Sequence, residues 1–255
     1  MLSIICAYNN KGILEECLIS SLDNQLNKDY ELILIDTLTH KFISAAEALN
    51  FGAEQAKGDN LLFIHQDVVL DNNNFIEDLS EWINKYEFGI AGLAGAITKN
   101  KQNLTITNSF HGIPRKLAGE ISNLMEATQC ETVDEFAFVI PKNIFDENPF
   151  ITFYPSWHLY AVEYCLRMRS IGHRVCVFPL SVWHRSEGDS FDPSYFKTIK
   201  PIARKYRYEF KKISTTMGGW ATNNLGLNLH IARYRFSLWR KQSKQQLKCL
   251  FKLVI

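Results

Sequence analysis

Four apolar runs rich in Ile, Leu and Val recur along the N-terminal part of the chain. They occupy residues 2–8, 30–36, 60–65 and 88–97. The segments between them are long enough for helices, so strands and helices are expected to alternate. Each run is continuously apolar, which is typical of strands buried on both faces of a parallel sheet. The sequence therefore predicts an α/β fold with a mostly parallel central sheet flanked by helices.

Two of the intervening segments have the periodicity of crossover helices. Residues 11–23 place Ile13, Leu14, Cys17, Leu18 and Ser21 on one face. Residues 42–56 do the same with Ala45, Ala46, Leu49 and Ala53. Apolar residues that recur at three and four positions indicate a helix with one buried face.

The pattern is looser after about residue 98, where polar and glycine-rich stretches predict loops and short elements. Strand-like runs return at residues 133–141 and 174–179, and a helix is expected between them at 157–171. No linker-like segment occurs before residue 197. The sequence therefore predicts one domain over residues 1–196 and a mostly helical extension over 197–255.

The formal net charge of +1 conceals an asymmetry between these two parts. Residues 197–255 hold 14 of the 28 Lys and Arg residues and one acid, Glu209, while residues 1–196 hold 14 basic and 26 acidic residues. Such a split predicts a tail that meets an anionic surface. The alternative is that the basic extension packs on the acidic body of the same chain.

The last part of the extension has a helical repeat. Arg240, Lys244, Lys248 and Lys252 recur every four residues, and another face carries Leu247, Leu250, Phe251 and Val254. This pattern predicts a basic amphipathic helix and peripheral contact with an anionic membrane through residues 233–255. Features that stack on bases or read a groove are absent from the sequence, so nucleic acid is not the expected partner.

Cysteine usage and hydropathy point to the cytoplasm. None of the six cysteines forms a C-x-x-C pair, and no basic segment precedes the first apolar run. No apolar run approaches the roughly 18 residues needed to cross a bilayer. We expect reduced thiols and a cytoplasmic protein, peripheral at the inner face of the cell membrane if the tail binds lipid.

Polar side chains follow the first three predicted strands. The first strand runs into Tyr8 and Asn9, the second into Asp36, and the third into His65, Gln66 and Asp67. In open α/β sheets, ligands bind beyond the carboxyl ends of the strands. A single carboxylate at a strand end is often a cap or turn residue, but three consecutive strands that end this way favour a ligand site.

The ordered motifs resemble a known family. The runs "SIICAYN", "ELILIDTLT" and "ALNFGAEQAKGDNLLFIHQDV" are similar to the opening of the inverting glycosyltransferases of family 2, which have the GT-A fold. The later blocks "VDEFAFVIPKNIFDE" and "WHLYAVEYCLRMRSIGHRVCVFPLSVWHRSEG" resemble the acceptor half of a bacterial subgroup. The resemblance covers roughly residues 1–190. It implies a nucleotide-sugar half over residues 1–98 and an acceptor half over 99–196.

The resemblance also implies roles for the residues at the strand ends. Asp67 would be the last acid of the D-x-D motif and would hold Mn²⁺ or Mg²⁺, with His184 as a further ligand and His65 in the place of the first acid. The implied residues for the nucleotide sugar are Tyr8, Asn9, Asp36, Asn50 and Gln66. A hard divalent cation prefers oxygen ligands and bridges to phosphate, in agreement with a carboxylate at this position.

One departure from the family concerns the catalytic base. Family 2 enzymes usually carry an acid six residues before the arginine equivalent to Arg167, and that position is Ala161 here. The residues near this position that can accept a proton from an acceptor hydroxyl are Glu163, His158, Asp134 and Glu135. We rank Glu163 first and His158 second.

The sequence thus predicts a metal-dependent, inverting glycosyltransferase of the hexosyltransferase type. The resemblance implies a UDP-, GDP- or dTDP-sugar donor and a glycan or lipid-linked saccharide acceptor, as in polysaccharide biosynthesis. One alternative is a nucleotidyltransferase that forms sugar nucleotides, disfavoured because a glycine-rich phosphate loop is absent. Another is a non-catalytic module that binds nucleotide sugars or partners, which Ala161 keeps open. The sequence is compatible with an oligomer.

Overall fold

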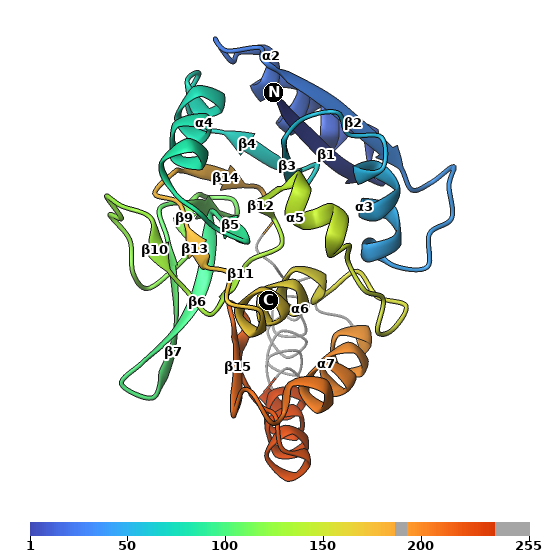
Figure 1. Cartoon of the computed structure of the whole chain (residues 1–255), viewed down its shortest axis with the longest axis vertical. Coiled ribbons are helices and arrows are strands. Elements are labelled where there is room, and N and C mark those ends of the chain that lie inside the picture. The colour runs from blue at the N-terminus through green and yellow to red at the C-terminus, as the bar shows by residue number, and fades with distance from the viewer. Residues whose placement is uncertain (187–192, 238–255) are drawn as a thin grey trace, which may run out of the picture.

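The computed structural model describes residues 1–186 and 193–237. Its centre is a seven-stranded sheet in the order β10-β13-β5-β12-β3-β1-β2. The strands are β1 (Leu2–Tyr8), β2 (Tyr30–Asp36), β3 (Asn60–Ile64), β5 (Ile90–Gly92), β10 (Thr128–Gln129), β12 (Ala137–Pro141) and β13 (Val175–Val177). The predicted α/β fold is confirmed (Figure 1).

The sheet is mixed, and its parallel part is the one that the sequence indicates. β1 pairs in parallel with both β2 and β3, and β13 pairs in parallel with β5. β12 lies between β3 and β5 and is antiparallel to both, and the edge strand β10 is antiparallel to β13. The carboxyl ends of β1, β2 and β3 therefore meet at one edge, while β12 enters the sheet from that same edge.

Helices cover both faces of the sheet. They are α1 (Lys11–Leu14), a π-helical turn η1 (Glu15–Ile19), α2 (Ser20–Asp23), α3 (Ala45–Ala53), α4 (Phe75–Lys85), α5 (Lys142–Glu147), α6 (Tyr160–Ser170) and α7 (Pro193–Tyr206). The first three follow one another without a gap and fill the predicted segment 11–23. Ser44 begins α3, because its hydroxyl accepts a hydrogen bond from the Glu47 amide at 3.2 Å.

Two apolar clusters account for the continuously apolar strands. Successive residues of β1 point to opposite faces, so Ile5 joins the cluster that contains α3, α5 and α6, while Ile4 and Cys6 join the cluster that contains α1, α2 and α4. Both faces of the strand are buried, as the sequence predicts.

Three small sheets complete the fold. One has the order β11-β6-β7, with β6 (Ala94–Lys99), β7 (Gln102–Thr107) and β11 (Thr132–Val133). A second has the order β4-β14-β8-β9, with β4 (Val68–Leu70), β8 (Phe110–His111), β9 (Lys116–Leu117) and β14 (Val182–His184). The third is the hairpin of β15 (Lys212–Thr215) and β16 (Gly218–Ala221).

Two predicted strands are interrupted in the structure. The run 88–97 divides into β5 and β6, which belong to different sheets. The run 133–141 divides into the last residue of β11 and the whole of β12. The second break leaves Asp134, Glu135 and Phe136 outside both strands, where their side chains are free to face a cavity.

The C-terminal elements form a third apolar cluster on α6. Residues 224–237 are helical, and this helix packs with α7 and the β15–β16 hairpin against Leu159, Val162 and Leu166. The division at residue 196 remains a prediction; α7 runs across that position. The residues of the predicted tail repeat, Arg240 to Val254, lie outside the described residues. Within residues 1–186 and 193–237, no helix combines the length and the apolar character needed to span a bilayer.

Candidate active site

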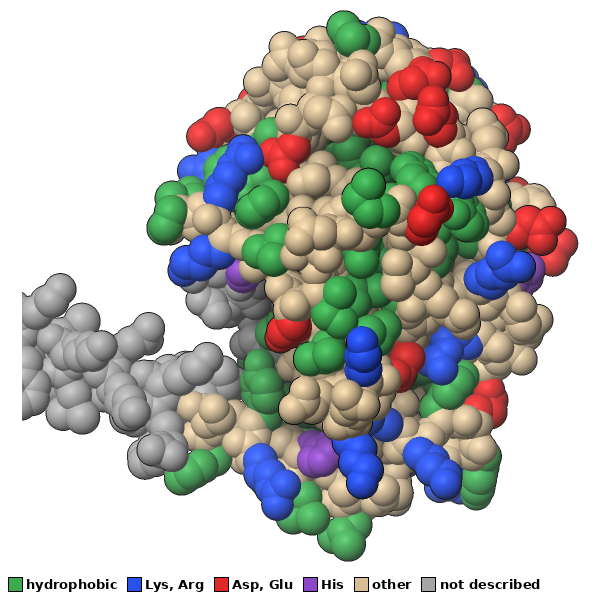
Figure 2. All heavy atoms as spheres, turned by 90° about the vertical axis from the view of Figure 1, so that its left-hand side faces the viewer, with side chains coloured by type: hydrophobic (Ala, Val, Ile, Leu, Met, Phe, Trp, Pro, Cys, Tyr) green, Lys and Arg blue, Asp and Glu red, His purple; other side chains and the backbone are tan. Residues whose placement is uncertain are grey.

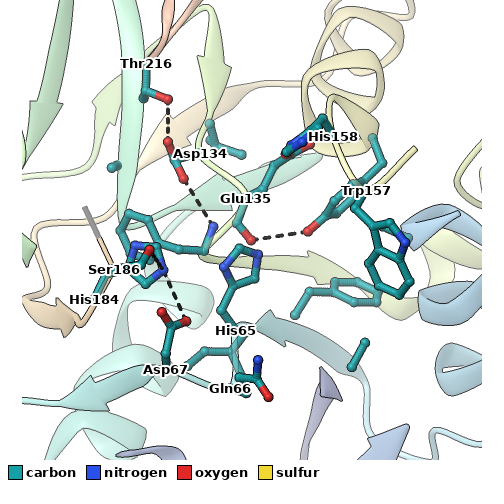
Figure 3. A pocket seen from close by; sticks show the side chains of 18 of the residues that line it. His65, Gln66, Asp67, Asp134, Glu135, Trp157, His158, His184, Ser186 and Thr216 are labelled. Carbon is teal, nitrogen blue, oxygen red and sulfur yellow. Dashed lines mark hydrogen bonds and ion pairs between the residues drawn. The ribbon is translucent and has the colours of Figure 1, made fainter. Parts of the chain in front are cut away.

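A cavity of about 750 Å³ opens beyond the carboxyl ends of β1 and β3. The ends of these strands, the segment between β11 and β12, the start of α6 and the β15–β16 hairpin all contribute to its lining. Figure 3 shows side chains from these separate elements pointing into one space. A site assembled from strand ends of an α/β sheet agrees with the general position of ligands in such folds.

Three potential metal ligands meet on one wall of the cavity. The ligand atoms of His65, Asp67 and His184 all lie within 4.8 Å of one another. Nε2 of His184 is 3.2 Å from Oδ1 of Asp67, as the dashed line between them in Figure 3 marks. The pairing of β14 with β4 sets this distance, because His184 is opposite Val68, the residue after Asp67. The structure thus brings together the three residues that the sequence predicts as metal ligands.

The charge states of this group suit a cation. Burial alone would raise the pKa of Asp67, but the hydrogen bond and charge of His184 outweigh it and lower the pKa to about 2. Burial and the neighbouring His184 lower the pKa of His65 to about 4, so the His65 ring is neutral at pH 7 and has a lone pair available. Two imidazoles and one carboxylate fit Mn²⁺ better than Mg²⁺, which prefers oxygen ligands.

The Gln66 side chain points away from those of His65 and Asp67 and stabilises the turn after β1 by hydrogen bonds. Its side-chain oxygen accepts hydrogen bonds from the backbone N–H groups of Asn9 at 3.1 Å and Asn10 at 2.9 Å. Its side-chain nitrogen donates to Oδ1 of Asn9 at 2.8 Å. Tyr8, Asn9 and Gln66 all line the cavity, but the amide of Gln66 is occupied by this turn.

Asp36 ends β2 beside Tyr8, its partner in register. Its carboxylate accepts hydrogen bonds from the backbone N–H groups of Leu38 at 2.9 Å and Thr39 at 3.3 Å. The Leu38 bond is the largest of the effects that lower the pKa of Asp36. Thr37, rather than Asp36, contributes to the cavity lining. Asp36 therefore shapes the turn at the rim of the cavity.

The structure places Asn50 at the loop after α5. Its side-chain nitrogen donates to the backbone oxygen of Phe150 at 3.0 Å, and its oxygen accepts from the Phe150 backbone N–H at 3.0 Å. Asn50 does not line the cavity. It fixes the loop after α5 to α3, because both hydrogen-bonding groups of its amide are used by one backbone residue.

Glu135 reaches the N-terminus of α6 from the break between β11 and β12. Its Oε1 accepts a hydrogen bond from the Ala161 backbone N–H at 3.3 Å. Burial and the nearby charge of Asp134 raise the pKa of Glu135 to about 8, and the backbone N–H groups of residues 159–161 oppose this shift. Leu159 begins the helix at a φ of 69°, a left-handed conformation that is uncommon for a branched side chain.

Asp134 and His158 also line the cavity. The Asp134 carboxylate accepts hydrogen bonds from the Thr216 hydroxyl and, at 3.2 Å, from the Phe136 backbone N–H. The backbone N–H of His158 donates to Oγ of Ser156 at 3.1 Å, and its ring packs 5.9 Å from that of Tyr195. Asp134 thus accepts hydrogen bonds from two donors. Glu135 accepts one at the N-terminus of α6, and His158 lies just before that helix.

The structure places Glu163, the residue ranked first as the base, away from the cavity. The Glu163 side chain is 1% exposed and lies outside the cavity. It pairs with Lys205 at 2.9 Å and Arg167 at 3.4 Å, and it accepts a hydrogen bond from the Tyr206 hydroxyl at 2.6 Å. These partners join α6 to α7, so Glu163 has a structural role on the face of α6 opposite Ala161.

Several lining residues have no local signal in the sequence. Ser186 follows β14 and its hydroxyl is 3.2 Å from Nε2 of His184. The remaining residues of this kind come from the C-terminal elements, and they are Tyr195, Thr215, Thr216 and Met217. They reach the cavity only because the C-terminal cluster packs on α6, which is a tertiary contact.

Comparisons with known proteins agree with this geometry. A family model described as "Glycosyltransferase like family" matches residues 3–206. A search of curated proteins gives no match.

Solved structures share the fold at low sequence identity. GalNAc-T7 with UDP, GalNAc and Mn²⁺ has a TM-score of 0.57 and 14% identity, over 80% of this chain and 47% of that one. S. aureus TarS 1-349 in complex with UDP-GlcNAc has a TM-score of 0.56 and 13% identity, over 79% of this chain and 65% of that one. The mannosyltransferase PcManGT from Pyrobaculum calidifontis in complex with GDP-Man and Mn²⁺ has a TM-score of 0.56 and 11% identity, over 82% and 65%.

The chain spans less than two thirds of each of these three structures, and their likeness to it is one of fold. The family model, in contrast, covers well over half of the chain and includes every potential metal ligand and every cavity carboxylate described above. The chain therefore belongs to the glycosyltransferase-like family and has the GT-A fold.

Proposed function

We propose that the chain transfers a sugar from a nucleotide-sugar donor to a hydroxyl of a glycan or lipid-linked saccharide, with inversion at the anomeric carbon. The observation that carries this proposal is one cavity with two kinds of group. His65, Asp67 and His184 supply metal ligands on one wall, and Glu135 supplies a carboxylate of raised pKa at the start of α6. Direct displacement of a nucleoside diphosphate needs both, on opposite sides of the reacting carbon.

The proposed donor is a UDP-, GDP- or dTDP-sugar. Tyr8, Asn9 and Thr37 line the end of the cavity above β1 and β2, which suits the nucleoside. The similar structures named above are described with UDP, UDP-GlcNAc and GDP-Man, which supports a donor of this class. Gln66 holds the backbone of residues 9–10 in place and so acts on the donor through that turn.

The proposed cofactor is Mn²⁺, with Mg²⁺ as the less suited ion, held by His65, Asp67 and His184. When bound, such a cation neutralises negative charge that develops on the departing diphosphate. The low pKa of Asp67 keeps its carboxylate ionised over the whole working range of pH. Ser186 lies beside this group, with its hydroxyl 3.2 Å from Nε2 of His184.

The proposed base is Glu135 in place of Glu163. In its ionised form Glu135 takes the proton from the acceptor hydroxyl, whose oxygen then forms the new glycosidic bond while the bond to the diphosphate breaks. A pKa of about 8 makes its carboxylate a stronger base than an ordinary glutamate. His158 is the second candidate because it lines the same part of the cavity. Trp157, exposed at the rim, offers an indole face to an acceptor sugar.

A non-catalytic role remains the second candidate function. The observation that favours it is Ala161, which leaves α6 without an acid of its own facing the cavity. A module of this kind would bind nucleotide sugar with the same metal dependence and would release no free nucleotide over time.

One experiment tests both the binding and the reaction. The full chain is incubated with a panel of UDP-, GDP- and dTDP-sugars with and without Mn²⁺, and both thermal stabilisation and release of the nucleoside diphosphate are measured. A ligand at 100 times its dissociation constant should stabilise the fold by about 2.7 kcal/mol. Stabilisation with slow donor hydrolysis supports the enzyme, and stabilisation alone supports the binding module. The absence of both stabilisation and hydrolysis would contradict the proposed function.

A further inference from the structure

The helix of residues 224–237 is apolar on two faces. Leu227 and Ile231 are buried and Tyr234 is partly buried, and all three pack into the C-terminal cluster against α6 and α7. The other face carries Leu225, Leu229, Ala232 and Phe236, and each of them is exposed. These four residues follow one another at spacings of four, three and four, so they form one line along the helix. We call them the C-terminal stripe.

The exposure of the C-terminal stripe is large for its residue types. Leu225 is 74% exposed, Leu229 is 50% exposed and Phe236 is 58% exposed. Nearby in sequence, Tyr208 is 86% exposed just beyond α7. Scattered surface leucines are common in soluble proteins, but a continuous line of apolar side chains on one helix face marks an interaction surface.

Positive charge surrounds the C-terminal stripe. Arg233 and Arg235 are exposed and project on its two sides, because each lies about 70–100° around the helix from Ala232 or Phe236. Residues 193–237 contain nine Lys or Arg residues and one acid, Glu209. Figure 2 shows Lys and Arg side chains interspersed with exposed apolar ones at the lower end of the molecule, and most Asp and Glu side chains on that face nearer the upper end.

From these observations we propose that the C-terminal stripe docks on the surface of an anionic lipid bilayer. The helix lies in the plane of the interface, with the leucines and Phe236 in the boundary between headgroups and acyl chains and Arg233 and Arg235 at the lipid phosphates. Charge complementarity selects this occupant, since an apolar line flanked by cations matches a surface that is apolar below and anionic above. The chain continues past Ser237 with five more Lys or Arg residues and no acid.

The docking helix is tied to the cavity through a shared core. Leu227 and Ile231 of the helix and Ile213 and Trp220 of the β15–β16 hairpin belong to the same apolar cluster. Thr215, Thr216 and Met217 of that hairpin line the cavity. A bilayer bound at the C-terminal stripe therefore has a fixed position relative to the cavity wall, which favours acceptors that are themselves attached to lipid.

Flotation of the full chain with vesicles tests this proposal. One set of vesicles is pure phosphatidylcholine and the other contains equal parts of phosphatidylcholine and phosphatidylglycerol. The chain should bind the anionic vesicles at low salt, and binding should weaken as salt is added. Leu225→Glu should lower the partition coefficient about tenfold or more. Arg233→Gln and Arg235→Gln should each lower it about fivefold, which corresponds to about 1 kcal/mol.

Leu26 provides a matched control. It is also a leucine that is 74% exposed, but it follows α2 at the other end of the molecule. Leu26→Glu should leave vesicle binding unchanged. All variants replace exposed side chains, so they should melt at the temperature of the unaltered chain, and a melting curve verifies this before flotation. Leu225→Lys keeps the charge favourable and should still bind more weakly than the unaltered chain if apolar insertion matters.

Four outcomes would overturn the proposal. The first is that the unaltered chain does not float with anionic vesicles at low salt. The proposal is also wrong if binding depends on the arginines but not on Leu225, in which case the contact is electrostatic and equally open to nucleic acid. Leu26→Glu weakens binding as much as Leu225→Glu does. The chain is a dimer that Leu225→Glu converts to a monomer without any vesicle binding, in which case a second copy covers the C-terminal stripe. None of these outcomes bears on nucleotide-sugar binding in the cavity.

Discussion

The carboxylate of Glu135 accepts a hydrogen bond from the backbone N–H of Ala161 at 3.3 Å. Position 161 is where the resemblance to family 2 enzymes leads one to expect an acid, and the side chain there is a single methyl group. Glu135 brings a carboxylate to the same helix terminus from the segment before β12. A carboxylate from 26 residues earlier in the chain thus lies at the helix terminus where an acid is expected, and the first prediction follows from this arrangement.

Glu135→Gln should lower turnover by about 10²–10⁴-fold, the usual contribution of a general base, while donor affinity stays the same. Glutamine has nearly the same shape and its oxygen still accepts the Ala161 N–H, so the start of α6 should be undisturbed. Steady-state kinetics and a binding titration with the donor measure the two effects separately.

Glu163→Gln is the matched control for this variant. It removes a charge from the buried contacts with Lys205 and Arg167, so it should lower the melting temperature and leave turnover per folded molecule nearly unchanged. If Glu163→Gln abolishes turnover and Glu135→Gln does not, the assignment of the base is wrong. A loss of turnover in His158→Ala alone would assign the role of base to His158.

The pH dependence of the reaction should have a limb set by Glu135. The carboxylate must be ionised to accept a proton, so turnover should rise with pH and level off above about pH 8. In Glu135→Gln this limb should be absent from the residual activity. A limb that persists unchanged in the variant would assign it to another group.

The same ionisation should lower the stability of the fold as the pH rises, whereas it raises turnover. Burial raises the pKa of Glu135 above its ordinary value of 4.5 to about 8, so between these values the folded chain holds a proton that the unfolded chain has lost. This contribution to the free energy of unfolding is fully present below pH 4.5 and is lost as the pH rises through 8. Glu135→Gln should therefore show a smaller decline in stability from pH 5 to 8, measured by urea unfolding in the absence of metal and donor.

Asp67→Ala should abolish Mn²⁺-dependent binding of the nucleotide while the chain remains folded. Asp67 is the one carboxylate in the group with His65 and His184, and its side chain contributes little to either apolar cluster. Calorimetric titration of the nucleoside diphosphate, with and without Mn²⁺, measures the effect.

Asp71 is the control for Asp67. The two side chains are similarly exposed, 17% for Asp67 and 19% for Asp71, but Asp71 pairs with Arg115 at 2.8 Å and lies outside the cavity. Asp71→Ala should keep the metal dependence. The metal site would be wrong if both variants lost Mn²⁺-dependent nucleotide binding equally, or if Asp67→Ala did not lose it.

Gln66→Ala should weaken donor binding about tenfold, because the backbone N–H groups of Asn9 and Asn10 lose their common acceptor and the turn after β1 loosens. Gln66→Glu retains an oxygen for both N–H groups but replaces the donor to Oδ1 of Asn9 with a charged acceptor, so it should recover only part of the affinity. Donor affinity that is the same in all three proteins would mean that the turn does not contact the nucleotide.

The predicted metal ligands that the structure brings together lie at or just beyond the ends of strands. Asp67 follows β3, whose carboxyl end lies at the cavity, and His184 ends β14, which lies beside Asp67 because β14 pairs with β4. The interruption of residues 133–141 is not visible in the sequence, because Ala137 and Val133 read as one apolar strand. The insertion of β12 between β3 and β5 separates β12 from β11 and leaves Glu135 between the two strands, where it lines the cavity.

The places where the site differs from the sequence-based expectation have identifiable physical causes. Glu163 is two residues from Ala161, about 200° around a helix, so the two positions face opposite directions. Asn50 matches a motif position, yet both groups of its amide are used by the backbone of Phe150. Thr216 comes from a hairpin in the C-terminal cluster, and a contact of that range leaves no periodic signal in the sequence.

The order of residues along the chain also determines when the site can form during synthesis. The turn at Asn9 and the segment of His65 and Asp67 leave the ribosome early, but β12, which pairs with β3, follows much later, and His184 and Thr216 follow later still. Contacts between such distant segments form slowly, after the costs of closing long loops have been met. A nascent chain that includes the turn at Asn9 but not β14 therefore lacks His184, one of the three proposed metal ligands, and the cavity is complete only when nearly all of the described residues have been made.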